Sequence, residues 1–123
     1  MGPPFFVVAR RFQNRYAQKA NMIHVIATIE LVSGTKERFL AEFKANVPAV
    51  LREAGCLEYG PTIDFQSGLP AQNSVGPNVV VVVEKWSDLN ALNAHLQAPH
   101  MIAYRTRVKD FVVHMGLQVL QSA

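Results

Sequence analysis

The sequence predicts an α+β fold of the ferredoxin-like type, and three observations support it. Strand and helix patterns follow one another in the order β-α-β-β-α(α)-β between residues 22 and 123. The helical stretches carry continuous apolar stripes that can cover one face of a sheet. Five consecutive valines, Val79–Val83, predict a strand that is buried on both faces. A chain of 123 residues is long enough for one such domain.

The first half of the pattern predicts two strands and a long helix. Apolar residues alternate from Met22 to Leu31, which is typical of a strand. A turn at residues 33–35 follows, with Ser33 or Thr35 available as the N-cap of a helix that runs to about Ala54. Gly55 then ends the helix. The second strand is predicted over residues 56–65, with one face formed by Leu57, Tyr59, Ile63 and Phe65.

The second half predicts a loop, a buried strand, two short helices and a last strand. Residues 66–77 are rich in Gly, Pro, Ser and Asn, so they form the loop, and residues 78–86 form the strand. Ser87 is the expected N-cap of the first short helix, and Pro99 begins the second. The last strand covers about residues 113–120, with alternating Val113, Met115, Leu117 and Val119.

The run of valines also predicts a partner for the sheet. Helices cover one face only, whereas Val79–Val83 place valines on both faces. In a small single-domain chain a second copy of the sheet is the obvious cover. We therefore expect a homodimer.

The positive charge lies in a short N-terminal segment. Residues 1–21 contain Arg10, Arg11, Arg15 and Lys19 and no acidic residue, whereas residues 22–123 contain 8 basic and 9 acidic residues. We expect residues 1–21 to be a basic extension outside the domain of residues 22–123. Three interpretations of this extension remain open: a membrane-surface or targeting helix, a helix that packs on a partner subunit, and an upstream extension without a fixed structure.

Composition excludes several classes of protein. The domain is close to neutral, so net charge gives no reason to expect nucleic-acid binding. Cys56 is the only cysteine, so no intrachain disulfide can form. No apolar run is long enough to span a membrane, and the first residues lack the pattern of a secretory signal. We expect a cytoplasmic protein.

The chain from Met22 to Gln121 resembles the antibiotic-biosynthesis-monooxygenase (ABM) superfamily, and within it the quinol monooxygenases. The motifs that carry the resemblance are MIHVIATIE at residues 22–30, VPAVLREAGCLEY at 47–59, EKW at 84–86, AHLQAPHMIAY at 94–104 and LQVLQ at 117–121. The resemblance implies a dimeric α+β barrel built from two ferredoxin-like subunits. It also implies a small aromatic or quinol substrate, oxidised by O2 with neither metal nor flavin.

Oxygenation without a cofactor requires a base that removes a phenolic proton, because only the anion is electron-rich enough to reduce O2. His95 is the first candidate for this base or proton shuttle, since histidine titrates near neutral pH. It falls at the C-terminal end of the first short helix, one turn from Leu92, so we expect it between the apolar stripe and solvent. The alternative is a histidine that interacts with the last carbonyls of its helix. Tyr104 and Arg105 are predicted to hold the developing oxyanion, although an exposed arginine on a helix is the default interpretation.

Four further residues are candidates for substrate binding. Trp86 and Tyr59 would line an apolar pocket, or only pack in the core. His100 would bind the substrate opposite His95, or bond locally at the start of its helix. His24 lies on the more polar face of the first strand and would point into the dimer barrel.

We expect neither a metal nor a cofactor. The four histidines show no HxH or HExxH spacing, and no glycine-rich phosphate loop is present. The resemblance to haem-degrading relatives would predict Asn, Trp and His at positions 27, 95 and 105. This sequence has Ala27, His95 and Arg105 there, so haem degradation is not expected.

The leading hypothesis is a homodimeric, cofactor-independent monooxygenase that oxidises a quinol or small polyphenol with O2. The alternatives are a non-catalytic small-molecule-binding or stress-response protein of the same fold, and a small-molecule isomerase.

Overall fold

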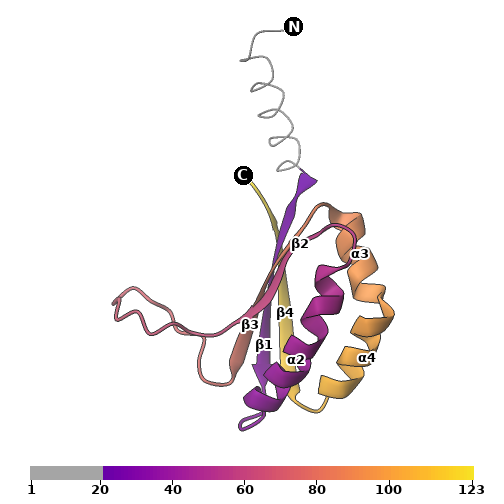
Figure 1. Cartoon of the computed structure of the whole chain (residues 1–123). Coiled ribbons are helices and arrows are strands. Elements are labelled where there is room, and N and C mark those ends of the chain that lie inside the picture. The colour runs from indigo at the N-terminus through magenta and orange to yellow at the C-terminus, as the bar shows by residue number, and fades with distance from the viewer. Residues whose placement is uncertain (1–20) are drawn as a thin grey trace, which may run out of the picture.

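The computed structural model describes residues 21–123, which form one antiparallel sheet and three helices (Figure 1). The sheet has four strands in the order β2-β3-β1-β4. The helices lie together on one side of it (Figure 1). Residues 1–20, which make up nearly all of the predicted basic extension, lie outside the described residues. The elements are β1 (Ile23–Leu31), α2 (Lys36–Leu51), β2 (Cys56–Thr62), β3 (Val79–Trp86), α3 (Leu89–Gln97), α4 (Pro99–Val108) and β4 (Val112–Gln121). The predicted fold class and element order are confirmed.

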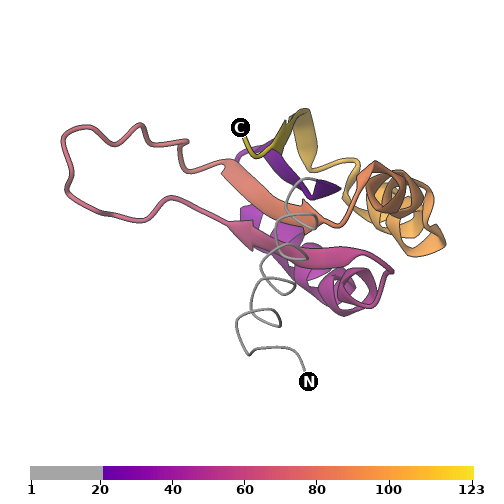
Figure 2. The ribbon, with the colours of Figure 1, turned by 90° about the horizontal axis from the view of Figure 1, so that it is seen from above.

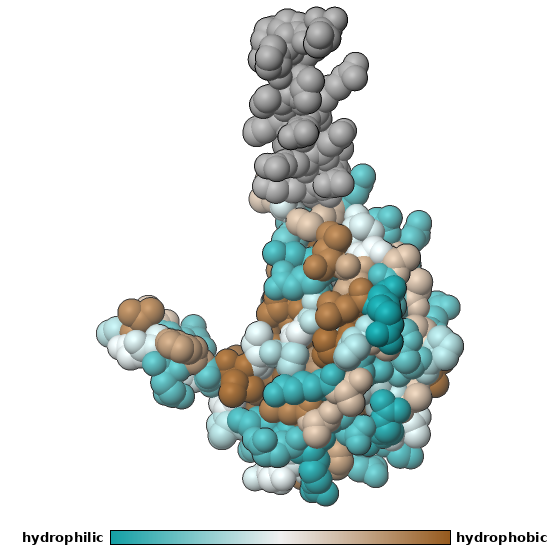
Figure 3. All heavy atoms as spheres, viewed as in Figure 1, coloured by the Kyte–Doolittle hydropathy of each residue, from teal (hydrophilic) through white to brown (hydrophobic). Residues whose placement is uncertain are grey.

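The second strand is shorter than predicted. β2 ends at Thr62, and Ile63 and Phe65 lie in a long loop with 53% and 79% of their surface exposed. The Asp64 carboxylate accepts the backbone N–H groups of Val75 and Gly76 and so ties the base of this loop. These bonds replace further pairing between β2 and β3. The loop consequently projects away from the body (Figure 2) and carries apolar side chains at its surface (Figure 3).

The helix ends also differ from the prediction. α2 ends at Leu51, three residues before Ala54, and Gly55 occupies a turn with φ of 82°. The N-cap of α3 is Asp88 and not Ser87, because the Asp88 side chain accepts the backbone N–H of Ala91. Thr35 occupies the N-cap position of α2, but its hydroxyl donates to the carbonyl of Val32 instead of capping the helix.

Odd- and even-numbered residues of each strand point to opposite faces of the sheet, and the two faces differ. Val80, Val82, Glu84 and Trp86 of β3 are buried beneath the helices, as are Val25 and the other odd-numbered residues of β1 from 25 to 31. Val79, Val81 and Val83 lie on the opposite face and are half-buried. Valines thus occur on both faces, as predicted. We call the face without helices the open face.

The last strand lies at the edge of the sheet beside β1. Its predicted apolar positions 113, 115, 117 and 119 are each about half exposed. Leu117 and Val119 lie opposite Ala27 and Val25, so they share the helix-facing side of the sheet. The pattern therefore predicted the strand correctly, while its edge position leaves these side chains largely uncovered.

Gly55 is the position in the fold least tolerant of a side chain. It has positive φ, and a Cβ atom there would lie 2.5 Å from Ser87 Oγ and 2.6 Å from Ala91 Cβ. Gly34 has nearly the same φ, 84°, but nothing lies within 4 Å of its Cβ position. The turn at Gly55 thus packs directly against the start of α3, and it contains Glu53 two residues earlier.

Substitution of these two glycines separates backbone strain from overlap. Gly34→Ala should lower the free energy of unfolding by about 1 kcal/mol, the cost of a left-handed alanine. Gly55→Ala should lower it by about 3 kcal/mol, because overlap with Ser87 and Ala91 is added. Urea denaturation of both variants measures the difference. Equal losses would show that α3 does not pack on this turn.

Candidate active site

His95 lies in the core, on the last turn of α3. It follows Leu92 by three residues and is therefore on the same helix face, and only 2% of its surface is exposed. The prediction that it lies between the apolar stripe and solvent is wrong. The imidazole packs against two aromatic rings, with centroid distances of 4.6 Å to Trp86 and 5.3 Å to Tyr59. A polar ring in such surroundings needs a hydrogen-bond partner.

That partner is Glu53, in the turn between α2 and β2. Its Oε2 lies 2.8 Å from His95 Nδ1 and 3.0 Å from His100 Nε2. A carboxylate only accepts hydrogen bonds, so both imidazoles donate an N–H to this one oxygen. His100 is 30% exposed, whereas Glu53 is 13% exposed and His95 almost fully buried. The three residues therefore form a row from the surface into the core.

Glu53 determines which nitrogen of His95 can act as a base. Because Nδ1 donates its N–H to the carboxylate, the lone pair of the neutral ring is on Nε2. No described residue forms a hydrogen bond with Nε2. Burial lowers the pKa of His95, although the hydrogen bond that its Nδ1–H donates to Glu53 opposes this shift. At neutral pH the ring is consequently uncharged and able to accept a proton at Nε2.

Aromatic side chains surround the imidazole on its core side. Tyr59 stacks on Phe43 with ring centroids 5.3 Å apart and planes 10° apart, and Tyr104 meets Phe43 edge to face. Burial raises the pKa of the Tyr59 and Tyr104 hydroxyls above their usual range, so both stay protonated at neutral pH. Of the predicted site residues, the structure thus brings Trp86, Tyr59, Tyr104 and His100 into the neighbourhood of His95.

A second carboxyl group lies in the same region. Glu84 is 5% exposed, on the helix-facing side of β3, and its Oε1 accepts the indole N–H of Trp86 at 2.9 Å. Burial raises its pKa to about 7, and the negative charge of Glu53 adds to the effect, while the bond from Trp86 opposes it. This carboxyl group therefore titrates in the neutral range.

Two predicted residues lie apart from this cluster. Arg105 is exposed, and its Nη2 donates to the carbonyl of Leu96 at 2.8 Å, so it satisfies the C-terminal end of α3. His24 lies on the open face, between Lys85 of β3 and Leu120 of β4. Its placement on the face away from the helices agrees with the sequence pattern, but it is on the other side of the sheet from His95. Their roles in binding or catalysis stay predictions.

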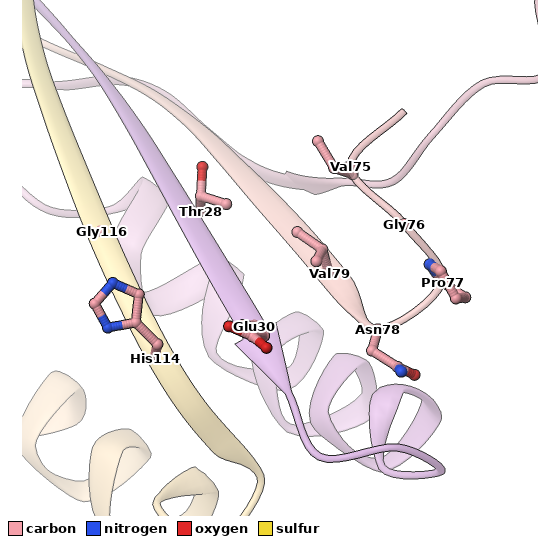
Figure 4. A pocket seen from close by; sticks show the side chains of 9 residues that line it. All are labelled: Thr28, Glu30, Val75, Gly76, Pro77, Asn78, Val79, His114 and Gly116. Carbon is pink, nitrogen blue, oxygen red and sulfur yellow. The ribbon is translucent and has the colours of Figure 1, made fainter. Parts of the chain in front are cut away.

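A hollow of about 550 Å³ is also present on the open face, and it contains no predicted site residue (Figure 4). Glu30 and His114 lie opposite each other on β1 and β4 beside it, and the end of the long loop forms its other wall. Within residues 21–123, no group of three or more His, Cys, Asp or Glu side chains is placed to hold a metal ion. None of the helices in this part of the chain is long and apolar enough to cross a membrane.

Glu53 and Glu84 were not predicted, although the sequence contains a signal for each. Glu53 follows Val50 by three residues and so continues the core-facing stripe of the long helix with an acid. Glu84 has the same strand parity as Val80, Val82 and Trp86, which places a carboxyl on the buried face. An acidic residue at a core position of an amphipathic pattern is the feature that would have identified both.

The fold and the cluster together define a ferredoxin-like α+β protein with an acid–base centre between its sheet and its helices. The family to which it belongs follows from comparison with known proteins. The chain belongs to the antibiotic biosynthesis monooxygenase family, whose model matches residues 22–107. This result confirms the resemblance found in the sequence, and it makes the protein a monooxygenase at the level of the family.

Individual relatives agree with this assignment. The chain is 41% identical over 102 residues to the probable quinol monooxygenase YgiN of Escherichia coli K12, which covers 81% of this chain and 97% of the relative. Among solved structures, a conserved protein from Methanosarcina mazei Go1 superposes with a TM-score of 0.75 at 18% identity, covering 88% of this chain and 99% of that one. PA3566 from Pseudomonas aeruginosa gives 0.70 at 23% identity, with coverages of 85% and 97%. These two structures support the fold.

Loss of the Glu53 carboxylate should destabilise the protein through His95. In Glu53→Ala the buried Nδ1–H has no acceptor, so the free energy of unfolding should fall by about 2 kcal/mol. The control is Glu58→Ala, which removes a half-exposed ion pair with Lys85 and should cost less than about 1 kcal/mol. Denaturant unfolding at pH 7 measures both. A Glu53→Ala loss no larger than that of the control would contradict the assigned hydrogen bond.

Proposed function

We propose that the protein is a cofactor-independent monooxygenase that oxidises a quinol or small polyphenol with O2. The observation that carries this proposal is the hydrogen bond between Glu53 and His95, which leaves a neutral imidazole with its lone pair on Nε2. The name of the relative from Escherichia coli supports a quinol as the substrate class. The family membership supports oxygen insertion as the reaction class.

The first step is removal of a phenolic proton. His95 Nε2 accepts this proton and the ring becomes an imidazolium, which the Glu53 carboxylate stabilises at Nδ1. The lowered pKa of His95 keeps the ring unprotonated before the reaction, so the base is available at neutral pH. The quinol anion then supplies the four electrons that reduce O2: one oxygen atom enters the ring, the other leaves as water, and the quinol becomes a hydroxyquinone. No electron has to come from a separate cofactor, because the substrate is itself the reductant.

The surroundings of His95 suit such a substrate. Trp86 and Tyr59 pack on the imidazole, and Phe43 stacks on Tyr59, so the base lies in aromatic surroundings that favour an aromatic ring over a sugar phosphate. An isomerase of a charged small molecule would need cationic groups, and the nearest arginine, Arg105, is bonded to the Leu96 carbonyl. The aromatic surroundings thus favour the oxygenase over the isomerase hypothesis.

The test is oxygen consumption with reduced quinones in the presence of a chelator and without added cofactor. Wild-type protein should exceed the rate of autoxidation, and His95→Gln should lose about 100-fold or more of kcat, the usual contribution of a general base. His114→Gln, on the exposed β4 strand, serves as the matched control and should keep its activity. Turnover no faster than autoxidation, together with tight quinol binding, would favour the non-catalytic binding protein instead.

We also propose that the working form is a homodimer in which a second copy covers the open face. Val79, Val81 and Val83 lie side by side on this face of the central strand β3, and Ile26 of β1 flanks them. A patch of β-branched residues on an uncovered sheet face is typical of a surface that packs against another sheet.

A charge at the centre of this patch should separate the copies. Val81→Lys should raise the dissociation constant of the dimer at least about 100-fold, because the ammonium group would be buried without a partner. Leu51→Lys is the control, since Leu51 is 51% exposed at the end of α2, on the helix side. Light scattering coupled to size-exclusion chromatography measures the mass. A wild-type mass of one chain at micromolar concentration would refute the dimer.

A further inference from the structure

Glu84 is a buried acid that the proposed base chemistry does not use. It belongs to the run of strand residues that face the helices, where its neighbours of the same parity are Val82 and Trp86. Across the sheet it lies opposite Tyr59 on β2 and Val25 on β1. The Trp86 indole is its one hydrogen-bond donor among the described residues, and none of their ion pairs includes it.

Such surroundings do not support a charged carboxylate. A buried carboxylate is stable when two or three donors or a cation compensate its charge, and one indole N–H does not suffice. The other titratable groups around it add no cation. Glu53 brings a negative charge, the hydroxyls of Tyr59 and Tyr104 and the thiol of Cys56 are neutral at pH 7, and burial favours the uncharged form of His95. Lys85, next in sequence, points to the open face and pairs with Glu58.

Glu84 is connected to the base through Trp86. The indole donates to Glu84 on one side, and its ring packs on the His95 imidazole with a centroid distance of 4.6 Å. The two acids of the cluster thus accept hydrogen bonds from different residues, Glu53 from His95 and His100 and Glu84 from Trp86. Glu53 fixes the tautomer of His95, whereas Glu84 fixes the ring that packs against His95.

We propose that Glu84 is a positioning residue of the oxidation site: a buried carboxyl group that holds Trp86 against His95 and whose protonated form leaves the site free to accept the negative charge of the quinol anion. This inference rests on the proposed function for its catalytic consequence. The protonation of Glu84 itself does not depend on that function. Ionisation of Glu84 would place a second negative charge beside Glu53 and oppose formation of the substrate anion.

Trp86 makes this protonation directly measurable, because it is the only tryptophan in the chain. Its fluorescence should change with pH around a midpoint near 7 as the carboxyl group bonded to its N–H ionises. Glu84→Gln retains an oxygen that accepts the indole N–H but cannot ionise, so this transition should vanish. His95→Gln should retain it, which excludes titration of the adjacent imidazole as its source. Glu58→Gln, on the neighbouring strand, should behave as the wild type.

Infrared difference spectra provide a second, independent measurement of the protonation state of the Glu84 carboxyl group. The wild type should show the C=O band of a protonated carboxyl group at pH 6 that weakens above pH 7, and Glu84→Gln should lack it. The proposal is overturned if the band and the fluorescence transition both persist in Glu84→Gln, or if the wild type shows neither between pH 5 and about 9.

Activity then tests the positioning role. Wild-type kcat should fall about tenfold as the pH rises from 6 to 9, whereas Glu84→Gln should keep the rate of pH 6 across this range. Glu84→Ala should lose activity at every pH, because the indole then has no acceptor. If the spectra show the titration but no quinol is oxidised, the proposed function fails and the protonated Glu84 stands. If quinols are oxidised and Glu84→Gln follows the wild-type pH profile, the positioning role of Glu84 is refuted while the proposed function stands.

Discussion

The hydrogen bonds of one carboxylate oxygen hold the functional part of this molecule together. Glu53 Oε2 accepts N–H groups from His95 on α3 and His100 on α4, while Glu53 itself belongs to the turn that joins α2 to β2. Two consecutive helices therefore meet a turn that lies 42 to 47 residues earlier in the sequence, and they meet it at a single atom. Because His95 is almost completely buried, this bond compensates the desolvation of a polar ring within an aromatic core. The same bond determines the tautomer on which the proposed base catalysis depends.

The cluster contains two acids whose surroundings give them different properties. Glu53 has two imidazole partners and reaches solvent at its edge, whereas Glu84 has a single indole donor and is enclosed. A charge is tolerated at the first position and disfavoured at the second, and the negative charge of Glu53 increases the difference. The fold creates this difference without any group beyond its own side chains.

The two faces of the sheet have different proposed roles, one in the site and the other in assembly. Residues of β3 with even numbers point toward the helices and include Glu84 and Trp86, while the odd-numbered valines point to the open face. One strand thus serves the site and the proposed dimer contact in alternate residues. A change of register by one residue would exchange these roles, so the pairing of β3 with β1 and β2 constrains both.

The local sequence determined the elements and their order. Apolar alternation and helical stripes depend on neighbouring residues, so the strands, the helices and the two-sided character of Val79–Val83 could be predicted. The resemblance of the motifs to the antibiotic biosynthesis monooxygenase family was equally readable, and the family match confirms it. Predictions failed where the end of an element depends on a particular side-chain hydrogen bond. β2 stops at Thr62, just before Asp64 bonds across the loop, and the N-cap of α3 is Asp88, whose side chain accepts the backbone N–H of Ala91.

Only the tertiary structure decided the chemistry of His95. Its sequence neighbours suggested a helix end near solvent, but Glu53, which is 42 residues earlier, and the rings of Tyr59 and Trp86 enclose it. The sequence identified the histidine and both aromatic residues as candidates and missed both acids, and it gives no distance between any of them. Protonation depends on burial and on charges within a few ångströms, and these are properties of the packed chain. For that reason the residue types were determined by the sequence alone, while the tautomer of His95 and the raised pKa of Glu84 were decided by the fold.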